Sequence, residues 1–273
     1  MRVISALIAC AGLAAGFTAA QAREQVEISQ SGVTLRAVLY RPDGPGPFPA
    51  VVALHGCGGL ADKSGPITPR FEEWGERLKT AGFAVLFPDS FASRGLGSQC
   101  GIRERGARAS RERVDDTNAA RQWLQSQPWV IRERVSLIGW SNGGTTTLWT
   151  VRDKTASPGG DFRSAVAFYP GCRDLQKAGW TARVPILILN GAADDWTPAA
   201  PCEQIVAAAQ GRGAEAAIVT YPEAYHDFDA PNLLVHQRKG VAFSADGSGI
   251  VHIGTNEPAR ADALKRAPEW LAR

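Results

Sequence analysis

Short apolar segments alternate with amphipathic helical segments along most of this chain. The run Ala50–Leu54 is continuously apolar, as expected for a strand that is buried on both faces of a sheet. Thr68 and Pro69 then supply a capping hydroxyl and a proline at the first helical position, and Gly82 ends the helix. The alternation predicts an α/β fold, a mostly parallel central sheet with helices on both faces in a three-layer sandwich. Further strands are predicted at 83–87, 135–138, 165–168, 185–189 and 217–221, and helices at 110–125, 142–153, 200–210 and 257–271.

The segments before the first parallel strand fit the same domain. Residues 26–29 and 33–40 are rich in β-branched side chains and flank a Ser-Gly turn, so they predict an antiparallel hairpin. No linker divides the chain after residue 22, and we expect one domain over residues 23–273. Hydrophobic residues make up 44% of the chain and charged residues 21%, which excludes intrinsic disorder. The formal net charge of +3 gives no indication of a nucleic-acid partner.

The first 22 residues have the pattern of a secretory signal peptide. Arg2 is the positive start, residues 3–17 are apolar, and Ala20-Gln21-Ala22 is a small-residue cleavage site. The alternative of a membrane anchor is disfavoured because about 20 apolar residues are needed to span a bilayer. Residues 7–10 resemble a lipoprotein processing box, but the apolar run continues past Cys10. We therefore expect export to the periplasm or the extracellular space, with no membrane span after cleavage.

The cleaved chain would keep four cysteines, an even number that makes disulfides plausible in an exported protein. Three pairings are possible. Cys57 and Cys100 follow two neighbouring predicted strands, and Cys172 and Cys202 follow two others in the same way. We predict the disulfides Cys57–Cys100 and Cys172–Cys202, with four buried free thiols as the alternative.

Motifs for metals and nucleotides are absent from the sequence. There is no His-x-x-x-His, Cys-x-x-Cys, acidic calcium loop, Gly-x-Gly-x-x-Gly or P-loop, and the chain has only four histidines. We therefore expect neither a cofactor nor a metal. The sequence does not determine the oligomeric state.

The pattern Gly-x-Ser-x-Gly occurs at Gly139-Trp140-Ser141-Asn142-Gly143. A predicted strand precedes it and a predicted helix follows it, which is the setting of a nucleophile elbow. In so tight a turn, a Cβ atom at either glycine would clash with the neighbouring strand or helix. Ser141 is therefore the candidate nucleophile, and a serine in an ordinary strand–helix turn is the alternative.

A serine hydroxyl needs a base before it can attack a carbonyl carbon. In hydrolases built on such an elbow, the chain order is serine, acid, histidine. His226 follows the predicted strand that ends at Tyr221, in a loop from which an imidazole can reach Ser141. The other two candidates, His236 and His252, lie in a polar tail of uncertain structure. We predict that His226 is the base.

The acid that orients the histidine should follow another strand. Asp194 and Asp195 both come after the predicted strand 185–189. From the residues alone, either carboxylate can take this role, and the other would be a loop or helix-start carboxylate.

An acyl-transfer site also needs two convergent backbone N–H groups to hold the developing oxyanion. One should belong to Asn142, which follows the candidate nucleophile, and the other to the loop after the first parallel strand. That loop reads His55-Gly56-Cys57-Gly58-Gly59, and its glycines let the backbone approach a substrate closely. A plain glycine-rich turn is the alternative. We interpret His55 as a residue that shapes the loop.

Taken in order, these segments resemble the dienelactone hydrolase family of α/β hydrolases, a resemblance that covers most of residues 33–260. It implies the α/β-hydrolase fold in a single domain. The matching segments are His55–Leu60, Pro88–Phe91, Gly139–Gly144, Asp194–Pro198 and Tyr225–Phe228.

The resemblance also implies particular site residues. The family pattern Gly-x-x-Asp-x-x-x-Pro starts at Gly191 and selects Asp194 as the acid, and the family's oxyanion position falls on the Cys57 N–H. Prototype members use a cysteine nucleophile where this chain has Ser141, and a glutamate where it has Gly56. Both departures favour a serine esterase over a true dienelactone hydrolase.

Two further features have a functional and a structural interpretation. Arginines are frequent between Arg94 and Arg113 and could face an acidic substrate, but interleaved acids favour a solvated, salt-bridged face. Trp140 and Trp196 flank candidate site residues and could form the wall of an acyl pocket or simply pack in the core.

The sequence as a whole predicts an exported serine hydrolase that cleaves carboxylic esters or lactones through an acyl-enzyme. One alternative is a peptidase or acyltransferase with the same triad. Another is a non-catalytic exported binding protein of the same fold. The substrate itself, a small-molecule ester, depends on long loops at 90–106 and 229–255 and is not determined by the sequence.

Overall fold

A computed structural model describes residues 23–273 except residues 31, 62–64, 66 and 155–158. The predicted signal peptide, residues 1–22, lies outside the described residues.

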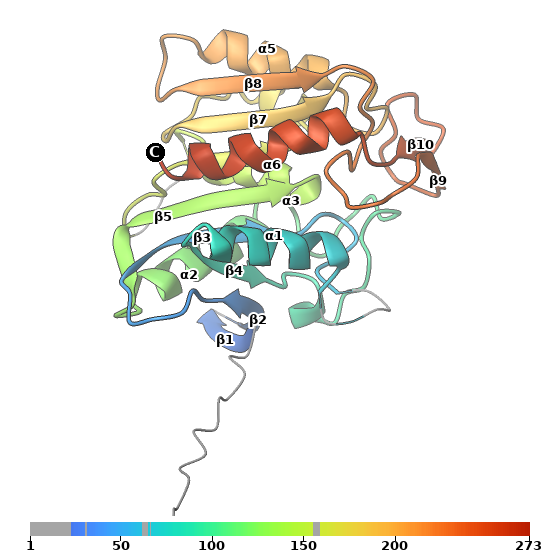
Figure 1. Ribbon diagram of the computed structural model, residues 1–273. Helices are drawn as coiled ribbons and strands as arrows, with labels where there is room; N and C mark the ends of the chain where they lie inside the picture. The colour runs from blue at the N-terminus through green and yellow to red at the C-terminus, as the bar shows by residue number, and fades with distance from the viewer. Residues whose placement is uncertain (1–22, 31, 62–64, 66, 155–158) are drawn as a thin grey trace, which may run out of the picture.

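The described chain is organised around one eight-stranded sheet with the order β1-β2-β4-β3-β5-β6-β7-β8 (Figure 1). The strands β1 and β2 form the predicted hairpin, and β2 also pairs antiparallel with β4. All pairings from β4 to β8 are parallel, so the predicted fold class is confirmed. The strands are β1 (Glu24–Gln30), β2 (Val33–Tyr40), β3 (Phe48–Leu54), β4 (Ala84–Pro88), β5 (Val130–Trp140), β6 (Ala165–Phe168), β7 (Ile186–Gly191) and β8 (Ala216–Tyr221).

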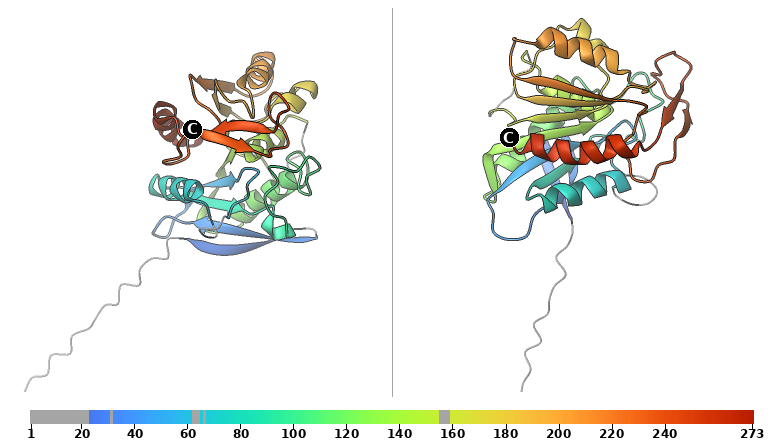
Figure 2. Two further views of the ribbon diagram at one scale, coloured as in Figure 1. Left: turned by 90° about the vertical axis from the view of Figure 1, so that its right-hand side faces the viewer. Right: turned by 45° about the horizontal axis from the view of Figure 1, so that its top comes forward.

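Helices cover both faces of this sheet (Figures 1 and 2). The helices α1 (Pro69–Thr80) and α6 (Glu257–Leu271) pack on one face, where Trp74 and Trp270 join one apolar core. The helices α2 (Glu112–Gln125), α3 (Asn142–Thr150) and α5 (Ala199–Ala209) pack on the other face around a second core. Two short helical segments, η1 (Ala92–Arg94) and α4 (Arg173–Lys177), lie in the connecting loops.

The strand β3 shows why its sequence is apolar without alternation. Val52 and Leu54 face the core under α2, α3 and α5, whereas Val51 and Ala53 face the core under α1 and α6. Because both faces of the sheet are covered, every position from 50 to 54 is fully buried.

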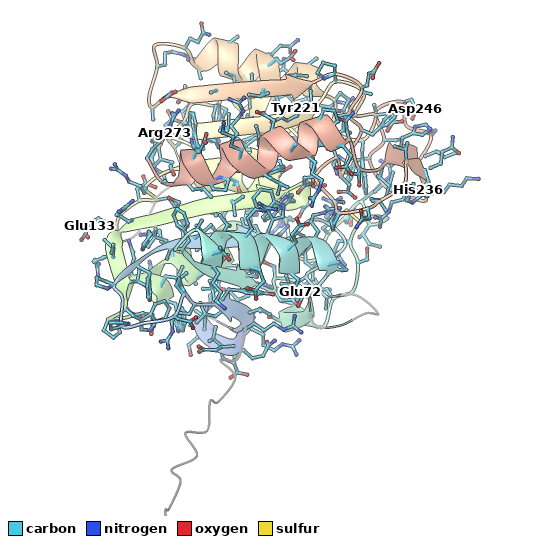
Figure 3. The ribbon with its side chains drawn as sticks, in the orientation of Figure 1. Glu72, Glu133, Tyr221, His236, Asp246 and Arg273 are labelled. Atoms are coloured by element: carbon cyan, nitrogen blue, oxygen red, sulfur yellow. A yellow bond between two sulfur atoms is a disulfide. The ribbon has the colours of Figure 1, made fainter. Side chains whose placement is uncertain are left out.

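A second, two-stranded sheet lies in the region that was predicted to be a polar tail of uncertain structure. The strands β9 (His236–Lys239) and β10 (Ile250–Ile253) pair antiparallel and project beside the ends of the parallel strands. In Figure 3, His236 and Asp246 mark this hairpin, at the end of the molecule opposite Glu133 and Arg273. Val251 and Ile253 of β10 are buried in a small apolar cluster with Trp196. Asp195 also fixes the hairpin by accepting hydrogen bonds from the His252 backbone and ring.

Both predicted disulfides are present. Cys57 is bonded to Cys100, and Cys172 is bonded to Cys202. Cys57–Cys100 joins two loops, and Cys172–Cys202 joins the start of α4 to the first turn of α5. Both bonds lie toward the carboxyl end of the sheet, where sites in open parallel sheets lie. Among the described residues, no helix is both long and apolar enough to cross a membrane.

The start of α3 approaches the end of β3 so closely that a side chain does not fit between them. A Cβ atom at Gly143 would lie 2.1 Å from the Leu54 carbonyl oxygen, which is backbone and cannot rotate away. The helix that follows Ser141 can therefore reach its position only with glycine here.

We predict that Gly143→Ala lowers the free energy of unfolding by at least about 3 kcal/mol, at the upper end of ordinary overpacking costs, because two backbone segments must separate. Gly97→Ala is the matched control, because Gly97 is exposed and a Cβ atom there would contact nothing within 4 Å. It should change the free energy by no more than about 1 kcal/mol. Denaturant unfolding of both variants measures the difference, and equal stabilities would contradict this account of the turn.

Candidate active site

Ser141 occupies a strained turn between β5 and α3. Its φ is 54° and its ψ is −115°, a left-handed conformation that a residue with a side chain rarely adopts. The turn is so tight that a Cβ atom at Gly139 would lie 2.4 Å from the Gly143 carbonyl oxygen. The conformation directs the Ser141 hydroxyl toward the loops at the carboxyl end of the sheet.

His226 lies in the loop after β8 and reaches this serine. Its Nε2 atom is 2.9 Å from Ser141 Oγ. The imidazole is only 1% exposed and is enclosed by two aromatic rings, Tyr169 at 4.5 Å and Trp196 at 4.7 Å between centroids. The Gly254 N–H donates to the His226 carbonyl oxygen at 3.0 Å and ties the loop to the region after β10. These contacts leave the ring little freedom to turn away from the serine.

Asp194 follows β7 and contacts the other nitrogen of the same ring. Its Oδ2 atom is 2.8 Å from His226 Nδ1, and its Oδ1 atom accepts from the Trp196 and Thr197 N–H groups at 2.9 and 2.8 Å. A carboxylate is an acceptor, so Nδ1 carries the proton and Nε2 is free to accept from the Ser141 hydroxyl. The three side chains therefore form one continuous hydrogen-bonded chain.

Asp195 and His252, two residues considered for the same roles, lie elsewhere. Asp195 Oδ2 is 2.7 Å from His252 Nδ1, and both side chains are more than one-third exposed. This second acid–imidazole pair holds the β9–β10 hairpin. His236 is exposed on that hairpin, and its Nδ1 is 2.8 Å from the Leu234 carbonyl oxygen.

Opposing effects set the protonation of His226. Burial alone would lower its pKa, but the adjacent Asp194 carboxylate outweighs burial by charge and by hydrogen bonding, and the pKa lies above the ordinary value of 6.5. Next along the chain, burial opposes ionisation of Asp227, yet its ion pair with Arg70 at 2.7 Å lowers its pKa to about 2. Asp227 is therefore charged, and its charge also favours the imidazolium.

The two residues whose backbone N–H groups are predicted to hold an oxyanion line the same cleft as Ser141. Asn142 is the first residue of α3, where an N–H has no partner within the helix. The Cys57 loop is held from the far side, because the Gln99 N–H donates to the Cys57 carbonyl oxygen at 2.8 Å beside the Cys57–Cys100 bond. Among residues that the structure describes, neither the Cys57 nor the Asn142 N–H donates a hydrogen bond. Both donors are therefore available to a bound molecule.

Two clefts meet at Ser141, with volumes of about 850 and 330 Å³. Cys57, Ser141 and Trp196 line both of them. Trp196 is therefore a cleft wall, whereas Trp140 is fully buried in the core. The larger cleft continues along a cationic and apolar wall formed by Arg103, Arg105, Trp149, Arg173 and Phe243, and the smaller along Gly58, Phe71, Leu233 and Arg238.

The interpretation of the arginine-rich segment as a solvated face is wrong for two of its members. Arg113 is fully buried, and Arg94 makes a bidentate ion pair at 2.8 Å with the buried carboxylate of Asp116. Arg108 does pair with Glu112 at the surface, as expected. Helix α2 turns its Arg113 face toward the sheet, and the interleaved acids concealed this in the sequence.

The sequence did not predict the residues that hold the His226 ring in place. The Thr197 hydroxyl donates to the Tyr169 carbonyl oxygen at 2.9 Å and lies 3.0 Å from both His226 Nδ1 and Asp194 Oδ2. Tyr169 directly follows β6 with a φ of 34°. A polar residue at the carboxyl end of a parallel strand is the signal that could have identified it.

No group of three or more potential metal ligands occurs within the described part of the chain. Around Ser141, the side chains of a serine, a histidine and an aspartate are joined by hydrogen bonds, on a parallel sheet with a tight turn between β5 and α3. Fold and site together define the class as a serine hydrolase with the α/β-hydrolase fold.

The comparisons with known proteins narrow the class. The dienelactone hydrolase family model matches residues 35–273, and the chain belongs to this family. A putative dienelactone hydrolase from Klebsiella pneumoniae has a similar fold, with a TM-score of 0.69, 19% identity and coverage of 92% of this chain and 98% of that one. Esterase 2 from Thermogutta terrifontis has a TM-score of 0.63, 18% identity and coverage of 92% and 94%.

A curated relative is similar over a shorter region. The uncharacterized peptidase YuxL of Bacillus subtilis is 24% identical over an alignment of 235 residues that covers 73% of this chain. The chain spans only 34% of that protein's length.

The site geometry predicts how His226 titrates. In Asp194→Asn the imidazole loses its adjacent negative charge while burial remains, so its pKa should fall below the wild-type value. Asp195→Asn is the control and should leave the pKa of His226 unchanged, because Asp195 contacts His252 instead. Nitrogen-15 NMR titration can follow all four histidines of the chain. A His226 pKa that moves only in Asp195→Asn would reverse the assignment of the two acids.

Proposed function

We propose that this protein is an exported serine hydrolase that cleaves carboxylic esters or lactones through an acyl-enzyme. The proposal depends chiefly on one observation, the unbroken chain of hydrogen bonds from Ser141 through His226 to Asp194. The same three residues follow three separate parallel strands, so a chance surface contact does not account for their meeting.

The proposed reaction begins when His226 Nε2 takes the Ser141 proton as Oγ attacks the ester carbonyl carbon. The N–H groups of Cys57 and Asn142 donate to the oxyanion that forms on the carbonyl oxygen. His226 then returns the proton to the leaving alcohol, and water attacks the acyl-enzyme by the same route. Asp194 keeps the proton on Nδ1 and stabilises the imidazolium in both halves of the reaction.

The base must be neutral at the start of each half-reaction. The pKa of His226 lies above 6.5 in the folded protein. Turnover should therefore be lost as the pH falls through the pKa of His226.

The two clefts support a substrate with two parts of unequal size. An ester lying across Ser141 would place its acyl group in one cleft and its alcohol in the other, while Trp196 borders both. A lactone, whose leaving group stays attached, could use the larger cleft alone. The likeness to an esterase supports ester cleavage, and the likeness to an uncharacterized peptidase supports amide cleavage as the second candidate.

A substrate panel with a labelling reagent separates these candidates. A fluorophosphonate should label wild-type protein at Ser141, because such reagents need an activated serine. Esters of graded acyl length, lactones and matched amides should then be compared by kcat/KM. Turnover of amides at the rate of the esters would establish the peptidase instead, and absence of labelling would favour a non-catalytic binding protein.

We predict that Ser141→Ala lowers ester turnover on the order of 10³-fold or more, because the members of a triad fail as a unit. The variant should fold normally, since the Ser141 hydroxyl contacts only His226 among the described side chains. Ser126→Ala is a matched control on the exposed end of α2 and should retain wild-type kcat/KM. Near-normal turnover by purified Ser141→Ala protein would refute the nucleophile.

We propose that residues 1–22 are a signal peptide and that residues 23–273 form one domain. The two disulfides support export, because disulfides persist in oxidising compartments. We predict that the exported protein begins at Arg23 and contains no methionine, because Met1 is the only one in the sequence. Intact mass spectrometry measures this directly. A mass that includes earlier residues, or a lipid adduct on Cys10, would overturn free export.

A further inference from the structure

Arg113 is a fully buried arginine that the proposed reaction does not use. It lies in the first turn of α2, and its guanidinium lies 5.1 Å from the centre of the Phe91 ring. Its Nη1 donates to Asn142 Oδ1 at 2.5 Å, and its Nη2 donates to the His55 carbonyl oxygen at 2.7 Å. No carboxylate within the described ranges lies in ion-pair contact with it. The guanidinium therefore donates to two neutral acceptors, while the carboxylates of Asp116 and Asp89 favour its charge only without direct contact. Burial of a charge without a contacting counter-charge is a costly arrangement.

These two acceptors belong to the two segments that supply the proposed oxyanion donors. Asn142 itself carries one N–H, and His55 lies two residues before Cys57, which carries the other. A guanidinium is a rigid planar fork, so two hydrogen bonds from its two ends fix the distance between the acceptors. Arg113 thus links the start of α3, which carries Asn142, to the loop after β3, which carries His55 and Cys57.

The burial of this group is not explained by satisfied hydrogen bonding alone. The Arg113 Nε atom is buried with no hydrogen-bond partner in the structure, and burial lowers the pKa of the side chain to about 9. Even so, the group is protonated near neutral pH. A simply structural position could hold an apolar side chain at lower cost, as replacements of buried ion pairs by apolar residues show.

The loop is also held by the buried side chain of His55. His55 is fully buried, and its Nδ1 donates to the Gly56 carbonyl oxygen at 2.8 Å. Burial and the nearby Arg113 charge lower the pKa of His55 well below 6.5, so the ring is neutral. It packs edge-on against Phe91, the ring that also contacts Arg113.

We propose that Arg113 is a positioning residue that sets the spacing of the Cys57 and Asn142 N–H groups and thereby stabilises the transition state. The inference rests on the proposed function of Ser141. Because the two donors act on the oxyanion and not on the ground-state substrate, loss of their spacing should lower kcat and leave KM nearly unchanged.

The test compares Arg113 with a second arginine on the same helix. Arg121 is also fully buried and lies two turns further along α2, packed against Phe162. We expect Arg113→Met to lower kcat about 10- to 100-fold, less than outright loss of an oxyanion donor, with KM within about threefold of wild type. Arg113→Lys should fall in between, because one ammonium cannot reproduce the fork. Arg121→Met and Arg121→Lys should lower stability and leave kcat within about twofold of wild type, since they do not contact the site.

A boronic acid inhibitor provides a readout that a merely structural role would not move. Its tetrahedral adduct with Ser141 places an oxygen where the oxyanion forms, so its affinity should fall in the Arg113 variants by the same factor as kcat/KM. In the Arg121 variants its affinity should match wild type. Unchanged kcat and unchanged boronate affinity in folded Arg113 variants would overturn the inference.

Asn142→Ala decides the case if Arg113→Met does not fold. This change removes the Oδ1 acceptor and keeps the backbone N–H, so it should lower kcat about 5- to 30-fold with little change in KM. Arg113→Lys should then add less to the loss in the Asn142→Ala background than in wild type. Full additivity, or wild-type kcat in Asn142→Ala, would overturn the inference. If wild type neither hydrolyses esters nor reacts with a fluorophosphonate, the proposed function fails and the inference falls with it.

Discussion

The close approach of the α3 N-terminus to the ends of β3 and β5 is the constraint on which the site depends. Backbone oxygens lie where Cβ atoms at Gly139 and Gly143 would be. Because both residues are glycines, α3 can begin directly after the end of β5. Ser141 then has to take a left-handed φ, at a cost of about 1–3 kcal/mol that the surrounding packing must offset. This conformation matters for the chemistry, because it exposes the Ser141 hydroxyl to the cleft that Asn142 also lines.

A buried carboxylate supports the other half of the site. Asp229 is fully buried and accepts hydrogen bonds from the Trp74 and Trp140 indoles at 2.8 Å and from the Tyr169 hydroxyl at 2.5 Å. Its oxygens are therefore satisfied in the core, and the side chain fixes three aromatic rings from α1, from β5 and from the position after β6. The Tyr169 ring packs against His226 at a tilt of 55°, so this network positions the imidazole without a hydrogen bond to Ser141.

The sequence was sufficient where the information was local. Continuous apolar strands and a glycine-flanked serine between strand and helix are patterns of a few neighbouring residues, and they predicted the sheet and the elbow. The choice between Asp194 and Asp195 was open from the residues alone, because adjacent side chains point in different directions only once the loop is folded. The β9–β10 hairpin and the inward face of Arg113 could not be predicted, since each depends on a partner far along the chain, Asp195 in one case and His55 in the other.

The loops that carry the site are held by cross-links in addition to a small apolar cluster of their own, which comprises Cys57, Cys100, Trp196, Val241, Val251 and Ile253. Cys57–Cys100 closes 43 residues and Cys172–Cys202 closes 30, and both bonds lie at the carboxyl edge. In the chain-entropy account, each bond contributes about 4 kcal/mol by restricting the unfolded chain. In the folded protein both bonds also anchor segments of the larger cleft, because Cys57 and Cys172 line it. The Asp195–His252 pair adds a polar link between the loop after β7 and the β9–β10 hairpin, so covalent, polar and apolar contacts together keep these loops in place.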